Sequence, residues 1–223
     1  MTETKPTLTA HCHHLKPGAP LKGVASLLSA QQGVRLESYP WYQGGNKQAT
    51  QAWVGHDAEH LFVHFECVDR HISCKPRKLN GDVCCDSCVE LFASPWPQTK
   101  PHYFNLEINA CGVLHLGYGE MRTNRKLVDA DIADKFTVLS SFPGPSKDES
   151  PEDKGWTVTA RLPFAALDKF IGEPLPHEKG ARWACNFYRC GGITDPQYCC
   201  WSPIGLPNPD FHVPAFFSPL LFS

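Results

Sequence analysis

The sequence has no long apolar run and no excess of charge of either sign. No segment approaches the roughly 18 consecutive apolar residues of a transmembrane helix, and no apolar region follows the polar first residues. We therefore expect no membrane span, and either a cytoplasmic protein or a secreted one from which a leader has been removed. With 21 Lys and Arg against 23 Asp and Glu, the net charge of -2 argues against a nucleic acid partner.

Motifs of several enzyme classes are also missing. The sequence contains no Gly-x-Ser-x-Gly, no His-Glu-x-x-His and no glycine-rich loop of the kind that cradles phosphate. These absences argue against a serine hydrolase, a zinc peptidase and a nucleotide-dependent enzyme.

Cysteine, by contrast, is abundant. The count of 11 is odd, so the thiols cannot all pair within one chain, and without an export signal a reducing compartment with mostly free thiols is favoured. The segment Cys84–Cys88 contains one Cys-x-x-Cys, and the pair Cys199–Cys200 offers two more thiols. A cysteine-based zinc or thiol protein is therefore one alternative. We expect most of these cysteines to be small core residues instead, because a strand pattern follows the single Cys-x-x-Cys.

Apolar residues recur mainly with a period of two. In Leu61–Cys67 every second residue is apolar and falls on one face, while His64 falls on the other. Similar patterns occupy residues 89–92, 104–109, 113–116, 136–140, 156–162, 182–188 and 219–222. Helical patterns are confined to residues 22–32 and 163–170. Short strands separated by turn residues predict an all-β fold, an antiparallel β-sandwich with one or two short helices.

The length of 223 residues favours a single domain. The polar segment 143–155 lies between two predicted strands and is expected to be a solvated loop inside that domain. We assign residues 36–223 to the β-sandwich. Residues 1–35 are expected to pack on it or to be partly disordered.

Polar side chains alternate with apolar ones along the predicted sheet. Glu90, Glu107 and Asn109 are expected to project from one face, and Arg189 ends a later strand. Carboxylate, amide and guanidinium groups make the directed hydrogen bonds that bind sugar hydroxyls. A carboxylate pair is also the arrangement of a glycoside hydrolase, so catalysis by Glu90 and Glu107 is a second alternative.

Five motifs then resemble one family. They are Asp86–Phe92, Tyr103–Gly112, Ala184–Arg189, Trp201–Ile204 and Phe211–Pro214, and they occur in the family's order between about Tyr39 and Phe222. The family is the family 9 carbohydrate-binding modules, and the resemblance is greatest to its family 9-like branch. It implies a DOMON-like, jelly-roll-like β-sandwich without catalytic activity that binds mono- or oligosaccharides at chain ends.

The resemblance also implies site residues. Glu90 and Asn109 match polar contacts, Phe211 matches an aromatic wall, and Arg189 is expected to clamp a hydroxyl. Cys84 stands where the first aromatic wall is expected, and a cysteine cannot stack on a sugar ring. We expect either a different binding mode, with the loop aromatic Trp41 as substitute, or loss of sugar affinity.

Calcium sites occur in the resembled family. Four carboxylates offer hard oxygen ligands for such an ion: Asp57, Asp69, Asp82 and Asp86. No further cofactor is expected. The expected partner is a carbohydrate, in glycan or polysaccharide utilisation. A glycoside hydrolase is a second partner with which the protein could associate.

Overall fold

The computed structural model describes residues 8–42, 44–142, 144–146 and 148–223. Within these ranges, one sheet contains thirteen strands. The strands are β1 (Ala10–His14), β2 (Val34–Arg35), β3 (Thr50–His56), β4 (His60–Val68), β5 (Cys88–Ser94), β6 (Tyr103–Asn109), β7 (Leu114–Gly119), β8 (Lys126–Leu127), β9 (Thr137–Ser140), β10 (Gly155–Pro163), β11 (Arg182–Cys190), β12 (Cys199–Cys200) and β13 (Ser218–Phe222). The helices are α1 (Leu21–Ser29), α2 (Ala130–Ala133) and α3 (Phe164–Ile171), with single turns η1 (Val83–Cys85) and η2 (Pro214–Phe216). None of the helices in the described ranges has the length and apolar character needed to cross a membrane.

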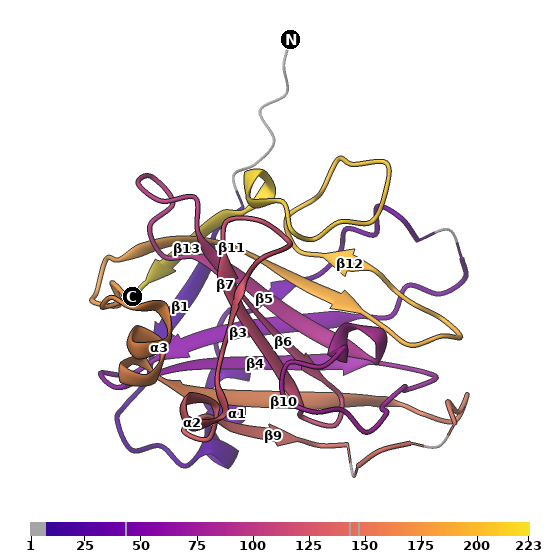
Figure 1. Ribbon diagram of the computed structural model, residues 1–223. Helices are drawn as coiled ribbons and strands as arrows, with labels where there is room; N and C mark the ends of the chain where they lie inside the picture. The colour runs from indigo at the N-terminus through magenta and orange to yellow at the C-terminus, as the bar shows by residue number, and fades with distance from the viewer. Residues whose placement is uncertain (1–7, 43, 143, 147) are drawn as a thin grey trace.

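The sheet curls into two layers (Figure 1). Its strand order is β8-β7-β6-β5-β11-β13-β1-β3-β4-β10-β9, with β12 beside β11 and β2 beside β3. Most neighbours are antiparallel, as predicted, but β1 runs parallel to both β13 and β3, so the sheet is mixed. The all-β sandwich with short helices is thus confirmed, and β1 adds a parallel join between the two layers.

The core lies between the layers. The period-two pattern places Leu61, Val63 and Phe65 of β4 inward, where each is at most 2% exposed. Phe65 meets Phe187 of β11 edge-on, with ring centroids 6.1 Å apart. Aromatic rings from opposite layers therefore fill the centre of the sandwich.

A second apolar cluster covers the outer face of β3 and β4. Leu21, Val24 and Leu28 of α1 pack there on Trp53 and Phe62. The apolar residues of α1 recur three and four positions apart, so they form one stripe that the helix buries. His64, predicted to face solvent, is 2% exposed because its strand face is covered in this way.

The N-terminal part of the described chain contributes to the sheet. Residues 10–14 form β1, which lies between β13 and β3. The strand pattern there is short and its inward residues are small, Ala10 and Cys12. The boundary that we place at residue 36 stays a prediction.

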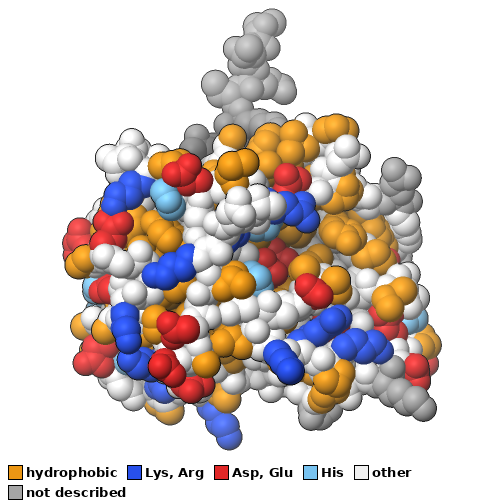
Figure 2. All heavy atoms as spheres, in the orientation of Figure 1, with side chains coloured by type: hydrophobic (Ala, Val, Ile, Leu, Met, Phe, Trp, Pro, Cys, Tyr) orange, Lys and Arg blue, Asp and Glu red, His pale blue; other side chains and the backbone are white. Residues whose placement is uncertain are grey.

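The molecular surface mixes charges of both signs. On the face drawn in Figure 2, Lys and Arg side chains are interspersed with Asp and Glu side chains among the coloured residues. This distribution agrees with the near-neutral net charge of -2.

Candidate functional site

One cleft brings together three of the predicted site residues. It has a volume of about 390 Å³ and lies over β5, β6 and the end of β11. Glu90, Glu107 and Phe211 line it. The other lining residues are Cys84, Cys85, Arg122, Cys190, Gly191, Gly192, Ile193, Tyr198, Pro209, Asp210 and His212.

The floor of the cleft is a pair of carboxylates. Glu90 of β5 lies directly opposite Glu107 of β6 in the antiparallel register, so both side chains project from the same sheet face. They are 2% and 7% exposed. Asn105 donates from Nδ2 to Glu107 Oε1 at 2.7 Å. Burial raises the pKa of both carboxyl groups, and repulsion from Glu107 raises the pKa of Glu90 further.

Phe211 forms one wall of the cleft. Its ring stacks on that of Tyr188, with centroids 4.2 Å apart and an angle of 8° between the planes. Trp41 packs on the same ring at a centroid distance of 5.8 Å, and its Nε1 donates to the carbonyl oxygen of Leu206 at 2.8 Å. Trp41 is absent from the lining of the cleft and supports Phe211 instead.

Tyr198 is an aromatic lining residue that sequence reasoning missed. Its side chain is 37% exposed, and its ring centroid lies 6.4 Å from that of Phe211. Its φ of 43° is in the left-handed region, which bulky residues seldom adopt. The available signal was its position in a Gly- and Pro-containing loop directly before the cysteine pair, a place where a ring is free to face a ligand.

The rim carries basic and imidazole groups that were also missed. Arg122 is 3.5 Å from Asp210, measured from Nη1 to Oδ1. The hydroxyl of Tyr103 lies 2.9 Å from Nδ1 of His212 and can donate to it when the ring is neutral. Burial, together with Arg125 and Arg122, lowers the pKa of His212 to about 4. Arg122 and His212 lie outside the predicted strands, so the alternation of apolar residues did not identify them.

The lowered pKa of His212 predicts a pH effect on stability. Between its usual value of 6.5 and about 4 the unfolded chain binds a proton that the folded protein does not. The contribution of His212 to the free energy of unfolding should therefore fall as the pH drops from 6.5 towards 4. Urea unfolding across this range should show a shallower fall in His212→Asn than in the wild type. Equal slopes in wild type and His212→Asn would contradict the assignment.

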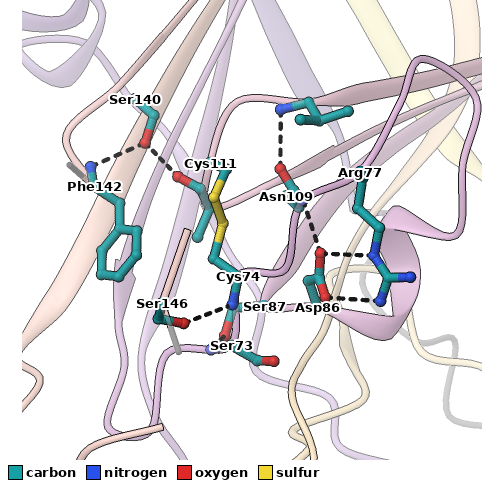
Figure 3. The surroundings of a disulfide bond; sticks show 12 residues. Ser73, Cys74, Arg77, Asp86, Ser87, Asn109, Cys111, Ser140, Phe142 and Ser146 are labelled. Atoms are coloured by element: carbon teal, nitrogen blue, oxygen red, sulfur yellow. Dashed lines mark hydrogen bonds and ion pairs between the residues drawn. A yellow bond between two sulfur atoms is a disulfide. The ribbon is translucent and has the colours of Figure 1, made fainter. Parts of the chain in front are cut away.

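The turn η1 places Cys84 and Cys85 on the rim, and a polar network fixes that turn (Figure 3). Arg77 binds Asp86 through two nitrogens, Nε at 3.2 Å and Nη2 at 3.0 Å. Asn109 donates from Nδ2 to Asp86 Oδ2 at 2.9 Å. Because Asp86 directly follows η1, this network positions the rim of the cleft.

A disulfide bond lies on the same side of the site. Cys74 is bonded to Cys111 in the turn after β6, with Cα atoms 5.9 Å apart (Figure 3). The bond ties the segment that leads to η1 to the end of β6. The other cysteines in the described ranges are free thiols.

Asn109 lies outside the cleft although it shares a sheet face with Glu107. It is fully buried, and besides its bond to Asp86 it accepts from the backbone N–H of Val113 at 2.9 Å. Its amide is therefore engaged in holding the turn between β6 and β7.

Arg189 is also absent from the cleft lining. Its side chain is 1% exposed, its Nη2 lies 2.9 Å from Asp69 Oδ1, and its Nη1 donates to Thr50 Oγ1 at 3.1 Å. The cause is strand parity: Arg189 is opposite Val89 in the sheet, so it projects into the core, while its neighbour Tyr188 is opposite Glu90.

No three of the aspartates considered for calcium come together within the described ranges. Asp57 accepts from the backbone N–H groups of residues 59 and 60. Asp69 pairs with Arg189, and Asp86 pairs with Arg77. Three of the four carboxylates thus have donor partners in separate parts of the fold.

The cysteine pair of β12, Cys199 and Cys200, does not form a common site with Cys84 and Cys85 of η1. Cys199 lies opposite Arg189 and Cys200 opposite Tyr188 in the sheet, and both are fully buried. Cys84 and Cys85 are exposed at the rim. The thiols proposed from sequence for a four-thiolate site are therefore distributed over different faces.

A second hollow, of about 720 Å³, lies over β3, β4 and β10. Its lining includes Glu66 and Val68, whose side chains are exposed, and none of the predicted site residues. The smaller cleft is the better candidate because it has a buried polar floor, which a ligand can satisfy.

A family model matches most of the chain. A sequence model of carbohydrate-binding family 9 matches residues 29–222. The chain is 26% identical to a candidate carbohydrate-binding protein from Bacteroides uniformis, with a TM-score of 0.86 and coverage of 98% of this chain and 100% of that one. No curated protein matches the chain.

Two further solved structures are similar in fold. One is a family 9 carbohydrate-binding module from Caldicellulosiruptor kristjanssonii in complex with glucose, at 11% identity and a TM-score of 0.64, covering 97% of this chain and 96% of that one. The other is a family 9 module from the same organism in complex with cellotriose, at 10% identity and a TM-score of 0.60, covering 96% and 93%. At these identities the likeness concerns the β-sandwich alone.

Proposed function

Because this chain belongs to carbohydrate-binding family 9, we propose that it binds a mono- or oligosaccharide in the cleft over Glu90 and Glu107. The observation that carries this proposal is the convergence of a carboxylate floor and the Phe211 wall in one cleft. Carboxylates accept hydrogen bonds from vicinal hydroxyls, and an aromatic ring packs on the apolar C–H face of a sugar. The volume of about 390 Å³ falls in the roughly 300–1,000 Å³ range of small-molecule sites.

The ligand that we propose is the end of a glycan chain. The cleft has a buried floor, and the η1 turn and the Phe211 segment flank it. A buried floor flanked on two sides suits a terminal sugar better than the middle of a chain, which would need a groove open at both ends. A role in glycan utilisation, beside a glycoside hydrolase, is the context that we infer from the family.

We propose that the protein acts by binding, without catalysis of its own. In a glycoside hydrolase the two carboxylates flank the scissile bond on either side of the sugar. Glu90 and Glu107 are instead direct cross-strand neighbours, so both approach a ligand from the sheet. This arrangement supports hydroxyl binding rather than attack from opposite faces.

Titration calorimetry with glucose and cellotriose tests the proposal. The wild type should bind at least one of them, and Glu107→Gln should bind about 10–100-fold more weakly, since a hydrogen bond to a charged group contributes roughly 1.5–3 kcal/mol. Glu173→Gln is the matched control, because that carboxylate pairs with Lys100 on the surface and does not line the cleft.

A glycan array extends the test to other sugars. An absence of binding to every glycan on the array, or equal affinity of wild type and Glu107→Gln, would overturn the proposal. Hydrolysis of aryl glycosides by the wild type that is lost in Glu90→Gln would favour the hydrolase alternative instead.

A further inference from the structure

Two thiols and a carboxylate meet at the floor of the cleft. Cys88 of β5 and Cys190 of β11 are directly opposite each other in the sheet, and Glu90 follows Cys88 by two residues on the same face. One ligand atom from each of the three side chains lies within 4.8 Å of the others. The Sγ of Cys190 donates to Glu90 Oε1 at 3.1 Å. All three side chains are buried.

The charge around this group is only partly balanced: Arg122 lines the same cleft, but its ion pair among the described residues is with Asp210 and not with Glu90. Among the hydrogen bonds of the described residues, the partner of Glu90 is the thiol of Cys190. Glu107, the next carboxylate on the floor, is bonded to the neutral amide of Asn105. A buried carboxylate is costly unless a cation or several donors compensate it, and here a second carboxylate lies beside it.

The ligand types indicate which cation fits. Thiolates are soft ligands that disfavour calcium and magnesium, whereas zinc accepts cysteine sulfur and carboxylate oxygen together. Zinc binds sulfur at about 2.3 Å and carboxylate oxygen at about 2.0–2.2 Å, so its ligand atoms lie roughly 3–4 Å apart. The separations among the three side chains require only small movements to reach that geometry.

We propose that Cys88, Glu90 and Cys190 bind a zinc ion at the floor of the cleft. Glu90 and Cys190 both line the cleft, while Cys88 lies beneath it. Three protein ligands leave one position of a tetrahedral ion for a non-protein ligand. Because two of the three ligands line the cleft, a water molecule or a hydroxyl group of a molecule bound in the cleft would occupy that position.

The zinc site is a separate proposal from sugar binding, and it can be tested with zinc alone. The reduced full-length protein is titrated with zinc in competition with a chromogenic chelator, without any carbohydrate. One zinc ion per chain is expected. Cys88→Ser and Cys190→Ser should each weaken binding by about 100-fold or more, which exceeds the roughly 10–100-fold effect of losing an outer-shell contact. Cys185→Ser, which changes a buried thiol outside the group, should bind zinc as the wild type does.

A second pair of measurements keeps the proposal testable if the serine variants do not fold. Glu90→Gln retains both thiols and should still bind zinc more weakly than the wild type. Cobalt should replace zinc and give a thiolate-to-metal charge-transfer absorption that Cys185→Ser retains in full and that is weaker in Cys190→Ser, which keeps one of the two thiolates.

Three results would overturn the zinc site. They are no stoichiometric zinc in the reduced wild type, equal zinc affinity in the wild type and all three ligand variants, and a Cys88–Cys190 disulfide in place of metal when the purified protein is mapped by mass spectrometry. Failure to bind any sugar, with zinc bound as expected, would remove the sugar proposal and leave the metal site standing.

Discussion

Replacing Asp69 with alanine is expected to lower the free energy of unfolding by about 3–5 kcal/mol, the usual cost of removing one partner of a buried ion pair. Asp69 Oδ1 lies 2.9 Å from Nη2 of Arg189, and both side chains are at most 4% exposed. The other carboxylate oxygen accepts from Nε1 of Trp156 at 2.8 Å. The variant would therefore leave a guanidinium charge and an indole N–H without their partner inside the sandwich.

Chemical denaturation of the wild type and three variants measures this effect. Asp69→Asn should be destabilised less than Asp69→Ala, because its amide oxygen can still accept from Trp156. Glu173→Ala removes one partner of the surface ion pair with Lys100 and should cost less than about 1 kcal/mol. A loss below about 1 kcal/mol in Asp69→Ala would show that the Arg189 charge does not depend on this carboxylate.

Replacing Phe211 with alanine is expected to weaken sugar binding by about 10–100-fold, since burying an aromatic side chain contributes roughly 1.5–3 kcal/mol. The ring lines the cleft and is held in place by its stacking on Tyr188. Trp41 packs on Phe211 outside the cleft, and the ring of Tyr198, which also lines it, lies 6.4 Å from that of Phe211 between centroids. Calorimetry with the sugar that binds the wild type measures the effect.

Two further variants distinguish direct contact of the Phe211 ring with the sugar from its packing in the apolar cluster. Phe211→Trp keeps a ring in the cleft and should retain most of the affinity. Phe216→Ala removes a ring that packs in the same apolar cluster without lining the cleft, so it should bind as the wild type does. Unchanged affinity in a folded Phe211→Ala would show that the sugar does not stack on this wall.

Much of the sheet was predictable because strand parity is a local property. The alternation in 61–67 correctly identified which residues of β4 face the core. The same rule put Glu90 and Glu107 on the outer polar face of their strands, and the register then made them neighbours. Parity also explains why Arg189 is not in the cleft. Arg189 projects from the same strand face as Phe187, towards the core, whereas Tyr188 projects from the opposite face, and the alternation of the sequence alone predicts this difference.

Other features depend on contacts between distant segments. The pattern in β1 is weak because its inward residues are small, and its parallel pairing with β3 and β13 joins segments more than 30 and 200 residues away. Asn109 has the parity of a cleft residue, but the turn that follows it and Asp86 of the η1 segment bind its amide. Tyr198 and His212 reach the cleft from loops, whose paths are not set by any periodic pattern.

The sequence by itself determined the all-β class, the faces of most strands and the family, because these depend on alternation and on motifs that lie within single segments. Only the tertiary structure decided which polar residues share a cleft, since that depends on register between strands and on the loops above them. It also decided that Cys88 and Cys190, two thiols far apart in the chain, lie opposite each other through antiparallel pairing.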